Sequence, residues 1–142
     1  MSTTTSTRIT VSALVAKPIA HVWKCWTGAE HIVHWNNASH DWHCPAATND
    51  LRVGGQFNNT MAARDGSASF DFIGTYTAVE PNKRIAYIME DGRTCEVLFA
   101  AEGAGTRVTE TFDAETENPL EVQRGGWQAI LDNYKAYIEG KD

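Results

Sequence analysis

Glu110 is the residue of this sequence best placed to carry chemistry. It stands between Val108 and Phe112 in a segment of alternating residues, and the two-residue period of a strand puts its carboxylate on their face. Burial there raises the pKa of a carboxyl group, which suits a residue that orients a ligand or acts as a general acid or base. An ion pair with Arg52, or a strand end open to water, would instead make Glu110 a structural residue.

Other polar residues offer contacts near the same face. Arg52 and Asp50 precede a Gly-Gly turn, where they form either an ion pair or a clamp for a charged substrate. Asn59 and Tyr87 fall on the inward side of their predicted strands and add polar contacts to an otherwise apolar surface.

A His-rich segment raises the question of a metal site. His31 and His34 lie one helical turn apart, and His40, His43 and Cys44 follow closely, all of them acceptable zinc ligands. The segment lacks the Cys-x-x-Cys and His-x-x-x-His spacings of common metal sites, so we predict solvated histidines, no metal and no cofactor. Cys44 has neighbouring histidines, but adjacent positions do not make side chains face one another, so a nucleophile is not predicted.

A sheet has to hold these side chains, and the sequence predicts its strands. Apolar residues alternate along several short segments, and the Asp-Gly pairs at 65–66 and 91–92 are typical of tight hairpins. Residues 36–50 show no such period and are predicted to form a long loop. The strands are predicted at residues 8–16, 51–53, 56–63, 69–79, 85–90, 93–101 and 106–113.

The last segment, residues 118–140, is predicted to be a long helix that covers the sheet. Its apolar residues recur at helical spacing, which places Trp127, Leu131 and Tyr134 on one face. Two shorter helices are predicted after Pro18 and at residues 29–35.

Capping residues predict the ends of the long helix. Asn118 as N-cap and Glu121 as its capping-box partner mark the start, with Pro119 between them, and Gly140 marks the end. The glycines at 125–126 either allow close contact with the sheet, open the helix locally, or indicate a later helix start.

The order of these elements and the residues that separate them resemble one protein family. Taken together they are similar to START-like helix-grip domains (the SRPBCC superfamily), in the branch of the activator of Hsp90 ATPase homologue. The matching pieces are Ala16-Lys17-Pro18, residues 22–27, Trp35, residues 49–55, residues 72–76, residues 105–109, Gly126-Trp127 and residues 130–134.

The resemblance implies an α+β fold with a central cavity. In that fold a curved antiparallel sheet of about seven strands wraps around a long C-terminal helix, and two short helices follow the first strand. The cavity commonly holds apolar or amphipathic small molecules, and the resemblance brings no catalytic motif.

Inward side chains of the predicted sheet and helix would form the wall of this cavity. They are mostly large and apolar with a few polar groups, as in sites for apolar ligands, whereas the alternative is a solidly packed core. The predicted ligand contacts are Arg52, Phe57, Asn59, Met61, Phe70, Phe72, Tyr76, Tyr87, Phe99, Glu110, Phe112, Trp127, Leu131 and Tyr134.

We therefore expect a binding protein for an apolar, aromatic or lipid-like small molecule, without an assigned reaction. The first alternative is an enzyme that uses the same cavity for proton transfer, cyclisation or hydrolysis, with Glu110 as acid or base. The second alternative, a module that associates with an Hsp90-type chaperone, rests on the family name alone and ranks last.

Length and charge narrow the number of domains, the kinds of partner and the compartment to be expected. The 142 residues fit a single domain, 1–142, with 1–7 as a flexible N-terminus. A net charge of −6 without any Lys/Arg run argues against a nucleic-acid partner. No apolar run is long enough to span a membrane, the N-terminus lacks a signal peptide, and three widely spaced cysteines suit a reducing compartment, so we expect a cytoplasmic protein. The sequence leaves open whether the protein forms a homodimer.

Overall fold

Seven antiparallel strands form one curved sheet in the described part of the chain, in the order β1-β7-β6-β5-β4-β3-β2. The computed structural model describes residues 7–37, 39 and 41–140, so most of the predicted flexible N-terminus lies outside the described residues. The strands are β1 (Arg8–Val15), β2 (Trp42–Asn49), β3 (Gln56–Ala63), β4 (Ser69–Glu80), β5 (Arg84–Met89), β6 (Thr94–Glu102) and β7 (Gly105–Asp113).

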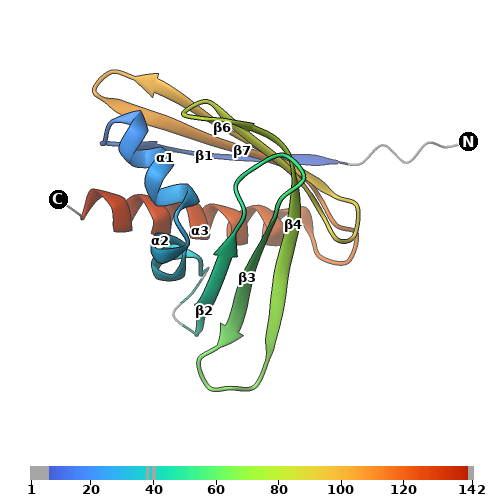
Figure 1. The fold of residues 1–142 in the computed structure, drawn as a ribbon. Helices are drawn as coiled ribbons and strands as arrows, with labels where there is room; N and C mark the ends of the chain where they lie inside the picture. The colour runs from blue at the N-terminus through green and yellow to red at the C-terminus, as the bar shows by residue number, and fades with distance from the viewer. Residues whose placement is uncertain (1–6, 38, 40, 141–142) are drawn as a thin grey trace, which may run out of the picture.

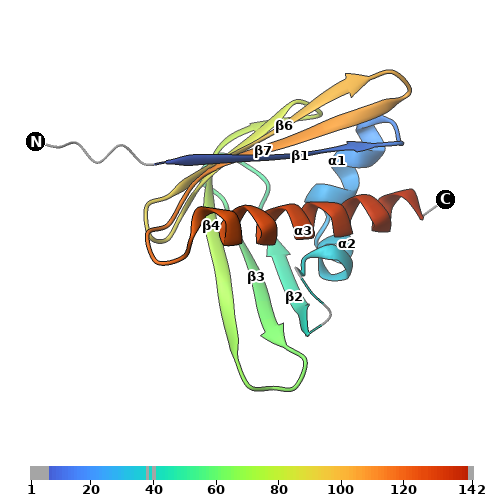
Figure 2. The same ribbon diagram turned by 180° about the vertical axis from the view of Figure 1, so that it is seen from behind.

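A long helix lies along the inner side of this sheet, as Figures 1 and 2 show from two sides. This is α3 (Leu120–Glu139), and the shorter α1 (Ile19–Thr27) and α2 (Ala29–Trp35) pack near its C-terminal half. The predicted α+β fold, with two short helices after the first strand and a C-terminal helix on a curved sheet, is confirmed.

The apolar face of α3 holds the layers together. Leu131, Tyr134 and Ile138 are fully buried, as their helical spacing predicts. The Tyr134 hydroxyl donates a hydrogen bond of 2.6 Å to the Val22 carbonyl in α1, and Asn133 Nδ2 donates one of 2.8 Å to the carbonyl at the end of α2. These two bonds fix both short helices to α3.

The region after α2 differs from the prediction. Residues 42–49, predicted as part of a loop, form the edge strand β2, and residues 51–53, predicted as a strand, form a turn. The β2 register shifts between His43 and Ala46, and Pro45 lies inside that irregularity. A bulge and a proline are tolerated at a sheet edge, and they remove the alternating pattern by which a strand is recognised.

The start of α3 is also corrected. The helix begins at Leu120, one residue later than the predicted capping pattern requires, and Pro119 takes the cap position without a side-chain hydrogen bond. The Gln123 side chain instead joins the helix to the preceding loop, because its Nε2 donates to the carbonyls of Glu115 and Asn118. Gly140 ends the helix, as predicted.

The two glycines of α3 lie inside the helix. A Cβ built on Gly125 or Gly126 meets no atom within 4 Å. Close contact with the sheet and a late helix start are therefore both wrong. The helix continues through both positions with open space beside them.

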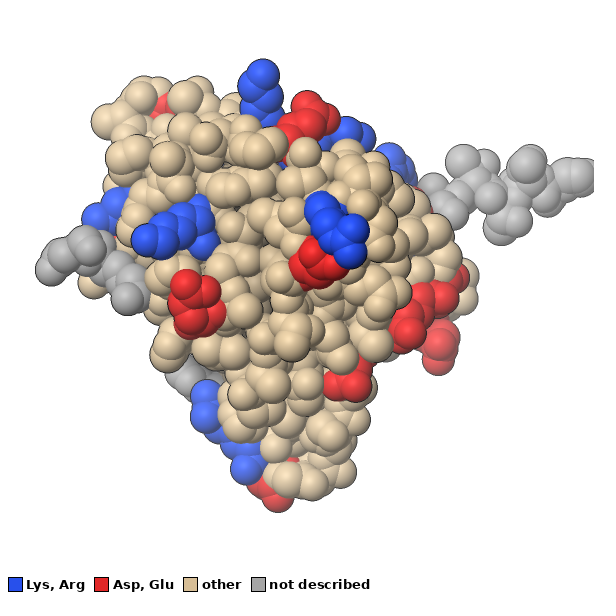
Figure 3. All heavy atoms as spheres, in the orientation of Figure 1, with Lys and Arg blue, Asp and Glu red and all other residues tan. Residues whose placement is uncertain are grey.

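Charged side chains of both signs are scattered over the face drawn in Figure 3, and Lys and Arg do not gather in one patch there. None of the described helices is long and apolar enough to cross a membrane.

Candidate functional site

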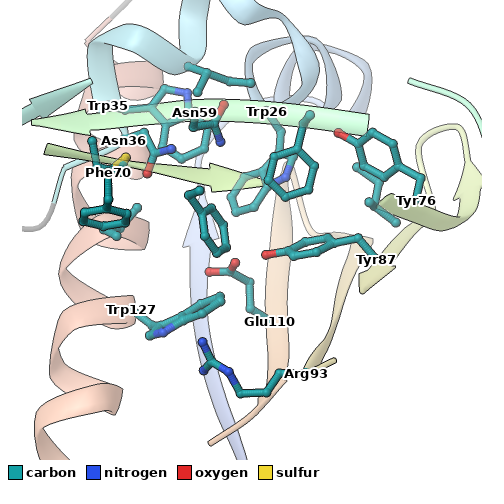
Figure 4. A pocket seen from close by; sticks show the side chains of 16 residues that line it. Trp26, Trp35, Asn36, Asn59, Phe70, Tyr76, Tyr87, Arg93, Glu110 and Trp127 are labelled. Atoms are coloured by element: carbon teal, nitrogen blue, oxygen red, sulfur yellow. The ribbon is translucent and has the colours of Figure 1, made fainter. Parts of the chain in front are cut away.

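A pocket of about 310 Å³ opens between the inner face of the sheet, α3 and the two short helices (Figure 4). Strands β3, β4, β5 and β7 supply most of its wall, because alternate residues of each strand face inward. The sequence-predicted residues that line it are Phe57, Asn59, Met61, Phe70, Phe72, Tyr76, Tyr87, Glu110 and Trp127.

Four other predicted contacts point inward but do not line the pocket. Phe112 is fully buried beneath the indole of Trp127, which stacks on it at 3.8 Å between ring centroids. Leu131 and Tyr134 are fully buried in the core, and Phe99 is covered by tryptophans of α1. Side chains of the helices thus fill part of the space that would remain for a ligand if every inward-facing side chain lined the pocket.

Arg52 lies away from the pocket. It sits in the exposed turn after β2, where its Nε donates to the Asp50 carboxylate at 3.0 Å. The predicted ion pair between Arg52 and Glu110 is therefore wrong, and the pair with Asp50 is the one formed.

Several lining residues were not among the predicted contacts. The lining residues on the two short helices can be predicted from helical spacing only when it is known that these helices close the pocket. The lining residues on β5 and α3 lie on apolar faces that the sequence already predicts. Arg93 stands just before β6, outside the regular alternation. The residues missed are Trp26, Ile32, Trp35, Asn36, Ile85, Arg93 and Ile130.

Four aromatic rings form a connected cluster in the pocket wall. Phe57 meets Tyr87 edge to face at 4.8 Å and Phe72 at 5.6 Å. Phe72 in turn lies 6.4 Å from Trp127 of α3. Rings at these separations attract one another and hold the wall rigid.

Gly74 makes room for this cluster. A Cβ built at this position would overlap the ring of Phe57 and would lie 2.9 Å from Cδ1 of Tyr87. This inward-facing glycine of β4 therefore has a packing role, since its missing side chain leaves space for two rings.

Glu110 is the buried carboxylate of the site. It is 5% exposed, and on the neighbouring strands it lies opposite Val11 of β1 and Val97 of β6, so apolar residues flank it on both sides. Among the described residues its carboxylate has no hydrogen bond or ion pair. Burial raises the pKa of Glu110 to about 8.

A tyrosine and a cysteine lie close to this carboxylate. Figure 4 shows the Tyr87 hydroxyl and the Glu110 carboxylate pointing toward each other. Burial, and after it the nearby Cys95 and Glu110, raise the pKa of Tyr87 well above its usual value. Burial and then Glu110 likewise raise the pKa of Cys95, so both neighbours stay neutral at physiological pH.

Asn59 presents a second unpartnered acceptor. The residue is 8% exposed and lines the pocket, and its Oδ1 has no hydrogen-bond partner in the described structure. Buried amide oxygens are rarely left without a donor. A donor on a bound molecule would satisfy it.

Arg93 is the cation of the pocket lining. Its Nε donates to Asp91 Oδ2 at 2.7 Å, within the turn before β6, and its Nη1 donates to the Asp113 carbonyl at 3.4 Å. Its charge is therefore already paired.

The His-rich segment does not assemble a metal centre among the described residues. His31 Nδ1 hydrogen-bonds the Tyr137 hydroxyl at 2.7 Å, and the His34 ring stacks on the same tyrosine. His40 lies outside the described residues, and His43 belongs to β2.

Cys44 is buried and poorly suited to nucleophilic attack. Its Sγ donates to the Ala46 carbonyl at 3.4 Å, and burial raises the pKa of its thiol.

Comparison with known proteins gives a consistent set of relatives. A family model described as "Activator of Hsp90 ATPase homolog 1-like protein" matches residues 16–139. The solution structure of an AHSA1-like protein from Aeromonas hydrophila is 49% identical, with a TM-score of 0.88 over 94% of this chain and 92% of that chain. A protein from Cytophaga hutchinsonii is also 49% identical, with a TM-score of 0.82 over 93% of this chain and 92% of that one.

A structure from Nitrosomonas europaea, 21% identical, shares the fold alone, with a TM-score of 0.82 over 95% of this chain and 96% of that chain. The comparison with curated proteins gives no match.

Proposed function

This chain belongs to the activator of Hsp90 ATPase homolog 1-like family, and from that premise we propose that it binds an apolar or aromatic small molecule in the pocket beneath α3. The observation that carries the proposal is the pocket itself. Protein interiors normally pack without gaps larger than a water molecule, whereas this space measures about 310 Å³.

The character of the wall supports a ligand rather than ordered water. Aromatic and aliphatic side chains make up most of it, and a few polar groups converge from different strands. Ligand pockets share this composition, and their volumes start at about 300 Å³, so a compact ligand of one or two rings fits best.

Native mass spectrometry and a thermal-shift screen against lipids, sterols and aromatic metabolites test the proposal. The variant Ile130→Trp adds a ring to the pocket wall, and Leu98→Trp adds the same ring on the outer, 41% exposed face of β6 as a control. We expect ligands that stabilise the wild type and Leu98→Trp but not Ile130→Trp. Equal stabilisation of all three proteins would contradict binding in this pocket.

Glu110 favours a second candidate, an enzyme that moves a proton on the bound molecule. A carboxyl group with a pKa of about 8 exists in both protonation states near neutral pH, which is the condition for a general acid or base. Incubation of each identified ligand with wild type and Glu110→Gln, followed by mass analysis of the ligand, tests it. Conversion by the wild type alone supports catalysis, and recovery of unchanged ligand from both supports binding without reaction.

We also infer a reducing, cytoplasmic compartment. Cys44 and Cys95 are free, buried thiols in the described structure. Free, buried thiols are typical of proteins that remain in such a compartment.

A further inference from the structure

We infer that the ligand of this pocket carries a basic amino group on its apolar or aromatic body, and that Glu110 binds this group as an ammonium ion. The inference rests on the proposed function and specifies the class of ligand. It follows from the polar groups of the wall, from the rings around them and from the charges that are already paired.

The pocket offers unpartnered acceptors. Glu110 is 5% exposed, faces the pocket and has neither a hydrogen bond nor an ion pair among the described residues. Asn59 lines the same pocket, and its Oδ1 also lacks a donor. A buried acceptor without a donor is costly, so the molecule that completes this site has to bring N–H or O–H groups.

Aromatic rings lie around the carboxylate. Tyr87 and Trp127 flank Glu110 in Figure 4, and Phe72 joins the two rings at 6.3 Å and 6.4 Å. Ring faces attract cations, and a carboxylate among several rings combines this attraction with a full countercharge. An ammonium group with at least one N–H satisfies both the rings and the acceptor.

The charged groups of the pocket lining also favour an amine. Glu110 is the one carboxyl group and Arg93 the one cation among the described residues that line the pocket. Arg93 is already bound to Asp91 at 2.7 Å, whereas no cation meets Glu110. A carboxylate ligand would bring a second negative group beside Glu110 as soon as Glu110 ionises, and it would have to compete with Asp91 for Arg93. An amine meets neither obstacle.

Proton balance gives this inference a measurable signature. The titratable groups that interact electrostatically with Glu110 are Tyr87 of β5 and Cys95 of β6, and burial raises the pKa of both, so they stay neutral. Those residues of α3, α1 and α2 that line the pocket are not titratable, and β1 places Val11 opposite. Glu110 itself therefore controls the proton count.

Because the pKa of Glu110 is about 8, the free protein holds a proton on this carboxyl group at pH 6 to 7. The ammonium ion keeps its own proton, so formation of the ion pair releases the carboxyl proton to solvent. Calorimetry in buffers of different ionisation enthalpy should then detect release of about one proton for each amine bound.

Isothermal titration with three indole probes tests the inference. Tryptamine carries the amine, tryptophol replaces it with a neutral hydroxyl group, and indole-3-acetate carries a carboxylate. We expect tryptamine to bind most tightly, and its affinity to rise about ninefold between pH 6 and pH 7 as Glu110 loses its proton. Tryptophol should show no such rise.

Two variants test whether the preference for the amine depends on Glu110 or on the negative charge of the protein as a whole. Glu110→Gln should abolish both the preference for tryptamine and its pH dependence. Glu96→Gln, on β6, removes a carboxylate that pairs with Arg84 outside the pocket lining, and it should leave both unchanged.

The outcomes also separate this inference from the function on which it rests. Equal binding of tryptamine and tryptophol, or tightest binding of indole-3-acetate, would contradict the inference that the ligand carries an amino group. The pocket would remain a binding site. Absence of binding by all three probes at millimolar concentration would count against both. The wild-type measurements decide the question even if Glu110→Gln does not fold.

Discussion

Glu110→Gln should change how the stability of the protein depends on pH. In the unfolded chain the carboxyl group titrates near 4.5, whereas burial raises the pKa in the folded protein to about 8. Between these values the folded state holds a proton that the unfolded state has lost. The stabilising contribution is therefore fully present below pH 4.5 and is lost as the pH rises through 8.

The size of the effect follows from the same pKa values. One pKa unit corresponds to about 1.4 kcal/mol, and the curve flattens as the folded pKa is approached. Between pH 6 and pH 8 the wild type should lose about 2 kcal/mol of unfolding free energy through this group alone. Glutamine keeps the shape and polarity of the side chain without a titratable proton, so the variant should not show this loss.

Urea unfolding of both proteins at pH 6, 7 and 8 measures the difference. All other titratable groups are common to the two proteins, so their contributions cancel in the comparison. We expect the variant to gain about 2 kcal/mol relative to the wild type from pH 6 to pH 8. Parallel curves, with a relative change below about 0.5 kcal/mol, would refute a buried, unpaired Glu110.

Three further predictions concern the packing and the His-rich segment. Gly74→Ala puts a methyl group into the ring of Phe57 and should cost about 1 to 3 kcal/mol of unfolding free energy in urea titrations; a neutral result would contradict the aromatic packing. Tyr134→Phe removes a buried hydroxyl group with a 2.6 Å hydrogen bond and should cost about 1 kcal/mol, so an unchanged midpoint would argue against that bond. Metal analysis of protein purified without a His tag should find no stoichiometric metal, and one equivalent that is lost in a His40 and His43 double mutant would overturn this.

The strands with clean alternation were predictable from the sequence, and β2 was not. In β1, Ile9, Val11, Ala13 and Val15 are buried in turn, so a period of two is visible in the residues themselves. In β2 the bulge beside Pro45 breaks that period, and the pairing with β3 that makes it a strand is a long-range property.

The pocket was predictable in outline only. Strand parity identifies which side chains face inward, and it placed Glu110 correctly on the buried face. It does not tell whether another side chain covers an inward residue, as Trp127 covers Phe112. It also says nothing of the α1 and α2 side chains, such as Trp26 and Trp35, that complete the wall.

The indole N–H signals of the five tryptophans give the most direct test of a ligand pocket beneath α3. Trp26, Trp35 and Trp127 line the pocket, whereas Trp23 packs against Phe99 outside it. When labelled protein is titrated with tryptophol, we expect saturable shifts of the three lining signals and a steady Trp23 signal. Unchanged signals from all three with millimolar tryptophol and with millimolar tryptamine, or shifts confined to Trp23, would contradict binding in this pocket.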